Sequence, residues 1–176
     1  DRRLSDLEAA LDWYRLSCLD RPLNGWVVYA MALAEVMPDQ AVRDMLKRFP
    51  FTEAERTAIT QARFSTQPVC RMLNRRAPLR PSETVALLAG LSDECLVFLL
   101  AKNASDKAKR SLSQYLTTYR EVKPMLTGKA LKALGVRPGP LYRTILERLT
   151  QARLDGDVKS EAEEQALVKE FADRAR

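Results

Sequence analysis

A glycine- and proline-rich segment between two amphipathic stretches is the part of this chain best suited to binding chemistry. It spans residues 134–140 (LGVRPGP), and the spacing of apolar residues on both sides predicts a helix before it and another after it. Gly135 can adopt a positive φ and end the first helix, whereas Gly139 lets a ligand backbone approach closely. Pro140 suits the first turn of the second helix. Exposed amides at a helix N-terminus suit phosphate groups, so the segment predicts contact with a nucleic-acid backbone.

Cationic side chains surround this hinge and could form charge-assisted contacts with phosphate oxygens. The aromatic ring of Tyr142 could stack on a base or sugar, or it could pack against the hinge. The residues predicted to bind RNA are Lys129, Lys132, Gly135, Arg137, Pro138, Gly139, Tyr142 and Arg143. The hinge is similar to a helix-hairpin-helix nucleic-acid motif, although the usual Gly-hydrophobic-Gly core is not matched. A purely structural corner between two helices is the alternative.

Several kinds of catalytic and metal site are excluded by residue type. The chain contains no histidine, which removes Ser-His-Asp and Cys-His catalysis and argues against zinc. Cys18, Cys70 and Cys95 are odd in number and lie in apolar stretches, as expected for buried thiols in a reducing cytoplasm. Asp155 and Asp157 have the spacing of a metal-binding pair, but they lie between two predicted helices and are expected to form a turn. We therefore predict no catalytic residue and no metal ligand, and leave open whether the chain is an enzyme.

Positive charge is concentrated in one third of the chain. Residues 1–100 hold 13 basic and 13 acidic side chains, residues 101–153 hold 12 basic and 3 acidic, and residues 154–176 hold 4 basic and 7 acidic. Residues 101–153 therefore carry a net charge of +9 in a chain of net +6. Such uneven placement favours a polyanionic partner. A solvated helix face that happens to be basic is the alternative.

Nearly the whole chain reads as helix, and no strand-like alternation of useful length is present, so the fold class is all-α. A helix near residues 26–37 has no polar face, which predicts burial, and Trp26 is expected in the core. Thr52 with Glu55 and Ser160 with Glu163 have the spacing of capping boxes. Pro68 would allow an interruption of the helix that begins after Thr52.

The best boundary lies at residues 122–124 (VKP), between a helical body at residues 1–120 and a helical RNA-binding tail at residues 121–176. The body carries an unexplained basic cluster. It could be a second RNA contact, a docking surface or a solvated face. Its members are Arg71, Arg75, Arg76 and Arg80.

A family resemblance supports the RNA-binding interpretation. Residues 122–131 (VKPMLTGKAL) followed by 134–140 resemble the C-terminal region of bacterial tRNA nucleotidyltransferases of the poly(A) polymerase family. The match continues through residues 152–156 (ARLDG), and residues 81–83 (PSE) resemble the preceding helical segment. The resemblance covers roughly residues 81–170, about half of the chain.

The resemblance implies an all-helical body and tail that hold tRNA by its backbone and shape. A separate N-terminal head would then add CCA, or the terminal A alone, to the tRNA 3′ end. Mg²⁺ and ATP or CTP are expected in that head, whose Gly-Ser element and paired aspartates are not recognisable here, and no cofactor is expected in this chain. The chain begins with Asp1 rather than Met, which fits a fragment of a longer protein.

Two alternatives belong to other functional classes. The first is a helical protein-interaction or oligomerisation module, and the second is a helix-hairpin-helix domain that binds DNA. No apolar run approaches the roughly 18–20 residues of a membrane-spanning helix. The sequence predicts neither the oligomeric state nor which nucleotides the parent enzyme would add.

Overall fold

The structure is a computed structural model that describes residues 2–18, 20–136 and 139–174. Within those ranges it is helical with no strand, which confirms the all-α fold class. The elements are α1 (Arg2–Ser17), α2 (Gly25–Val36), α3 (Asp39–Arg48), α4 (Glu53–Leu73), α5 (Pro81–Leu88), α6 (Asp93–Lys102), α7 (Asp106–Thr117), the 3₁₀ turn η1 (Tyr119–Glu121), α8 (Gly128–Ala133), α9 (Pro140–Asp155) and α10 (Glu161–Arg174). Below, "body" means α1 to η1 and "tail" means α8 to α10.

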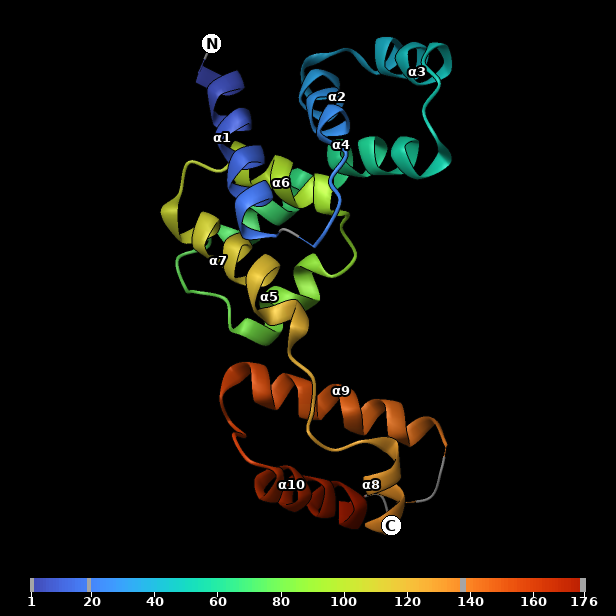
Figure 1. Cartoon of the computed structure of the whole chain (residues 1–176), viewed down its shortest axis with the longest axis vertical. Coiled ribbons are helices and arrows are strands. Elements are labelled where there is room, and N and C mark those ends of the chain that lie inside the picture. Colours follow the sequence, from blue (N-terminus) through green and yellow to red (C-terminus); the bar gives the residue numbers. More distant parts are fainter. Residues whose placement is uncertain (1, 19, 137–138, 175–176) are drawn as a thin grey trace.

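Helix α6 lies at the centre of the body. Its residues 95–100 are all buried, and α1, α2, α4 and α7 lie around it (Figure 1). A helix that is apolar on every side is stable in water only when neighbours cover it completely. Among the described residues, no single helix is long and apolar enough to cross a membrane, and α5 with α6 would qualify only as a pair bent by 115°.

The predicted burial of Trp26 is wrong. The residue is 44% exposed, and its ring stacks on that of Phe51 with 4.8 Å between the ring centroids. Helix α2 buries only one side, including Val28, whereas Tyr29 and Leu33 on the other side are exposed. The sequence could not show this, because which side of an apolar helix is covered depends on its neighbours.

Helix α4 runs from Glu53 to Leu73 without the interruption that Pro68 would have allowed. Pro68 is exposed, so the backbone groups left without helical partners face solvent. Burial of Val69 and Leu73 on the opposite side holds the last turns in place. At the other end of the helix, the predicted capping box of Thr52 with Glu55 is confirmed.

The tail has its own small apolar core. Its buried residues are Leu126, Leu131, Val136, Ile145, Leu149 and Val168, in a cluster separate from that of the body. The carboxylate of Glu164 is fully buried beside this core. It accepts hydrogen bonds from the backbone N–H groups of Met125 (3.0 Å) and Leu126 (2.8 Å), and it pairs with the Arg153 guanidinium at 3.2 Å. The predicted domain boundary near residue 120 stays a prediction, whereas the two clusters are observed.

Candidate nucleic-acid interface

The turn after α8 is a Schellman motif. The Gly135 N–H donates to the Lys132 carbonyl at 3.0 Å, and the Val136 N–H donates to the Leu131 carbonyl at 3.1 Å. Gly135 has φ +82°, a conformation that other residues rarely adopt. Leu131 and Val136 are both buried, which completes the apolar contact typical of this motif. The predicted role of Gly135 in ending the helix is therefore confirmed, whereas the likeness to a helix-hairpin-helix motif stays a prediction.

Helix α9 begins with an open N-terminus. Gly139 is the N-cap residue and Pro140 occupies the first turn, as the sequence predicted. No side chain of the described residues caps this end, and the first turn carries no acidic residue. Apart from its chain neighbours, no atom of the residues that the structure describes lies within 4 Å of a Cβ atom built at Gly139. The end of the helix thus carries a partial positive charge that no described side chain neutralises.

The predicted cations differ in their surroundings. Lys129 and Lys132 are exposed, lie one helical turn apart on α8, and have no ionic partner among the described residues. Arg143 is exposed as well, but its Nε atom donates to a Glu147 Oε1 atom at 2.8 Å. That hydrogen bond and the carboxylate charge raise the pKa of the Arg143 guanidinium. The two lysines are therefore the stronger candidates for phosphate contact.

Tyr142 packs against the hinge, which is one of the two roles left open by the sequence. Its hydroxyl donates to the Val136 carbonyl at 3.0 Å, and its ring lies close to Gly128. The side chain is half-buried and joins the start of α9 to the end of α8. Base stacking by this ring would require it to leave that position.

Two predicted residues, Arg137 and Pro138, lie outside the described residues. Of the other hinge residues, Tyr142 donates from its N–H to the Gly139 carbonyl at 3.0 Å and from its hydroxyl to the carbonyl of Val136, the residue after Gly135. Sequence reasoning did not single out Arg148, which is exposed on α9 and has no ionic partner in the described part of the chain. Its position in a helix that follows a basic hinge was the signal that could have identified it.

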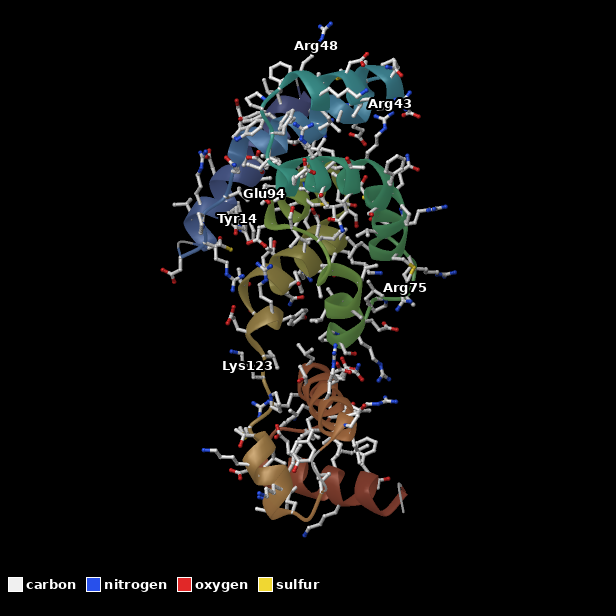
Figure 2. All side chains as sticks on the ribbon, turned by 90° about the vertical axis from the view of Figure 1, so that its right-hand side faces the viewer. Tyr14, Arg43, Arg48, Arg75, Glu94 and Lys123 are labelled. Atoms are coloured by element: carbon white, nitrogen blue, oxygen red, sulfur yellow. The ribbon has the colours of Figure 1, made fainter. Side chains whose placement is uncertain are left out.

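The basic cluster of the body divides into structural and free side chains. Arg75 pairs with Glu83 at 2.7 Å and its side chain is visible on the surface of the body in Figure 2. Lys107 of α7 donates from its Nζ atom to the carbonyls of Arg75 (2.6 Å) and Arg76 (3.2 Å), which draws α7 onto this loop. Arg71 and Arg76 are exposed without an ionic partner among the described residues. The cationic surface that these two side chains form on the body is therefore smaller than the predicted cluster of four arginines.

The side chains considered for metal or thiol chemistry can be placed in the part of the chain that the structure describes. No group of three or more His, Cys, Asp and Glu side chains there could hold a metal ion. Burial raises the pKa of the Cys95 thiol to about 12, so this thiol is un-ionised near neutral pH. Asp155 and Asp157 do not form a metal pair, because the Asp155 carboxylate accepts hydrogen bonds from Ser82. Gly156, which lies between them, ends α9 with φ +79°. The described residues therefore do not fit the Mg²⁺ site expected in the head.

Comparison with known proteins gives two matches. No protein-family model matches the chain. The chain is 32% identical over 176 residues to the A-adding tRNA nucleotidyltransferase of Geobacter sulfurreducens, a match that covers 98% of this chain and 20% of that enzyme. Its fold is similar to that of the Thermotoga maritima CCA-adding enzyme, which was solved in complex with tRNA_CCA. That match has a TM-score of 0.77 and 20% identity, and it covers 98% of this chain and 41% of the other.

The two matches support different conclusions about this chain. At 20% identity, the Thermotoga structure shows the fold alone. The chain spans about a fifth of the length of the Geobacter enzyme, so the activity of the whole enzyme does not transfer to it directly. Together the matches confirm the predicted resemblance: the chain is similar, over nearly all of its length, to part of a tRNA nucleotidyltransferase.

Proposed function

We propose that this chain holds tRNA for a tRNA nucleotidyltransferase whose catalytic head lies in another part of the protein. The tail would contact tRNA phosphates, and the head, with Mg²⁺ and ATP or CTP, would extend the 3′ end. Similarity to an A-adding enzyme at 32% identity supports this assignment. The likeness in fold to an enzyme solved with tRNA supports it independently.

The exposed cations at the α8–α9 hinge carry this proposal. Lys129 and Lys132 have no ionic partner among the described residues, and they belong to the segment that holds the excess positive charge of the chain. The open N-terminus of α9 at Gly139 belongs to the same hinge. Clustered cations without acidic partners are not needed to fold a helix, but they form favourable contacts with phosphate oxygens.

The test is tRNA binding measured over a series of salt concentrations. We expect the unaltered chain to bind more weakly as salt rises, because each neutralised phosphate releases counterions. A variant with Lys129→Ala and Lys132→Ala should bind more weakly, and the slope of log K against log salt should fall by about one for each cation removed.

A matched control removes the same number of cations far from the hinge. Lys47 and Arg48 of α3 are exposed, and Arg48 lies at the end of the body farthest from the tail (Figure 2). The variant with Lys47→Ala and Arg48→Ala should keep the slope of the unaltered chain. Equal losses in both variants would contradict a site at the hinge, and tighter binding to duplex DNA than to tRNA would favour the DNA-binding alternative.

One observation favours a second candidate, a protein-docking role. Trp26, Tyr29, Leu33 and Val36 recur at helical spacing along α2 and are between 39% and 60% exposed. Large exposed apolar stripes mark interaction surfaces. A concentration-dependent change in mass by ultracentrifugation, together with tRNA binding indifferent to salt, would favour this candidate.

A further inference from the structure

Helix α9 of the tail packs against α5 of the body, and at this contact an aspartate of the tail caps the body helix. Asp155, the last residue of α9, accepts hydrogen bonds from the backbone N–H (2.9 Å) and the hydroxyl (2.7 Å) of Ser82 in α5. The Asp155 side chain is only 11% exposed, although it is charged and lies at the surface of its own helix. These two residues are 73 positions apart in the sequence.

The chemistry of this contact is that of a helix N-cap supplied from elsewhere. Pro81 opens α5 and has no N–H group, so the Ser82 N–H is the first free donor of that helix. Asp155 supplies the oxygen atoms that an N-cap side chain usually provides, together with negative charge at the positive end of the helix. Arg80 lies 3.9 Å from the same carboxylate, but its side chain is 71% exposed, so solvent screens this pair.

The second connection between the units is the chain itself at residues 122–124. Just before it, Arg120 is held by Asp93, with hydrogen bonds of 2.7 and 3.1 Å. Just after it, Met125 and Leu126 are held by the buried Glu164. Figure 2 shows Lys123 in this connecting segment. This connection alone would let the tail rotate relative to the body. The packing of α9 on α5 restricts that rotation, and the cap at Asp155 fixes the end of α9 within this contact.

The orientation of α9 determines where the hinge cations lie. Asp155 is at one end of this helix and Pro140, next to the hinge, is at the other (Figure 1). Sixteen helical residues span about 24 Å, so a rotation of about 10° at Asp155 would move the hinge by about 4 Å. The exposed cations of the body, Arg71 and Arg76, would not move with it.

We propose that Asp155 is a positioning residue that sets the separation between the cations of the tail and those of the body, so that one RNA contacts both. The inference rests on the proposed function. An RNA held at two places binds more tightly than either contact allows, and the gain is lost when the geometry forbids simultaneous contact. Asp155 itself does not touch the RNA.

The experiment compares two RNAs on the same variants of the whole chain. One is full-length tRNA, and the other is a stem-loop whose helical stem is shorter than the ~24 Å length of α9. We expect Asp155→Ala to weaken binding of tRNA about tenfold, a modest part of the gain that two linked contacts supply, and to leave binding of the stem-loop unchanged. Asp155→Asn keeps one acceptor for the Ser82 N–H and should lose less.

The control is Asp157→Ala, which makes the same chemical change two residues away. Asp157 is exposed, and its side chain makes no hydrogen bond among the described residues. Equal weakening for both RNAs, or no weakening for tRNA, would overturn the inference. If Asp155→Ala fails to fold, Ser82→Ala tests the same contact from the other side. Failure of the unaltered chain to bind tRNA would instead overturn the proposed function, and the inference with it.

Discussion

The body and the tail reach a folded state by different means. Among the described residues, the apolar cluster of the body around α6 holds 28 buried side chains, whereas that of the tail holds six. Apolar burial stabilises by about 25 cal/mol per Å², so a small core leaves little margin over the entropy of ordering the chain. The tail adds a fully buried carboxylate, Glu164, and a left-handed glycine, Gly135. The body is thus stabilised mainly by many apolar contacts, whereas the tail depends more on a few specific polar ones.

The largest effect expected from this difference follows removal of Glu164. Glu164→Ala leaves two backbone N–H groups and the Arg153 guanidinium without their shared acceptor, at a cost of about 3–5 kcal/mol. The tail should unfold while the body stays folded. Tryptophan fluorescence reports the body alone, since Trp13 and Trp26 both belong to it, and hydrogen exchange of tail amides reports the tail.

The neighbouring Glu163 provides the control for that prediction. Its carboxylate caps α10 through the N–H groups of Lys159 (2.6 Å) and Ser160 (3.3 Å), and these bonds lower the pKa of Glu163. Because this side chain is exposed, Glu163→Ala should cost the tail much less than Glu164→Ala. A simultaneous loss of fluorescence and amide protection in Glu164→Ala would show that body and tail unfold as one unit.

In the tail, the turns and helix caps could be predicted from local sequence, whereas the buried charged groups could not. Gly135 and the capping box of Ser160 with Glu163 depend only on neighbouring residues, so their positions were predictable. The burial of Glu164 was not, because it depends on a backbone segment about 40 residues away and on Arg153. Neither was the contact between Asp155 and Ser82, since the residues that meet are set by how the helices pack.

The body contains a polar exception to its apolar character, and this exception gives it a pH dependence. Asp93 accepts from the Tyr14 hydroxyl at 2.5 Å and from both Nη atoms of Arg120. Burial alone would raise the pKa of Asp93, but the hydrogen bonds from Arg120 and Tyr14 hold it below its ordinary value of 3.8. The folded state therefore favours the ionised carboxylate. Its stabilisation is complete above pH 3.8 and is lost as the pH falls through the folded-state pKa.

Asp93→Asn should lower the free energy of unfolding of the body by about 2 kcal/mol at pH 7. The difference from the unaltered chain should shrink as the pH falls below 3.8, and urea denaturation followed by tryptophan fluorescence measures it. Asp12→Asn is the control, because the pair of Asp12 with Arg15 is 69% and 65% exposed and should contribute little. A difference that is the same at pH 7 and pH 3 would contradict this role for the Asp93 carboxylate.

The smallest effects are expected from substitutions at two glycines of the tail. Gly135 forms the turn of the hinge, and Gly139 lies at the N-terminus of α9, where a ligand could approach. Gly135→Ala places a side chain at φ +82° and should destabilise the tail by about 1–2 kcal/mol. Gly139 has extended backbone that any residue adopts, and a Cβ atom there meets no atom of the described residues within 4 Å, its chain neighbours aside. Gly139→Ala should therefore leave the thermal stability of the tail unchanged.

The two substitutions should differ in the opposite sense for RNA binding. If tRNA phosphates approach the N-terminus of α9, a methyl group at Gly139 occupies part of that space and weakens binding, even though the fold is intact. The Gly135→Ala variant should bind tRNA normally at temperatures where the tail is folded, because Gly135 shapes the turn and does not contact the RNA. Measuring the melting temperature and the tRNA affinity of both variants separates building the hinge from contacting the ligand. Unchanged affinity in Gly139→Ala would move the contact away from the helix end and toward Lys129 and Lys132, because those side chains reach outward without needing the backbone to approach.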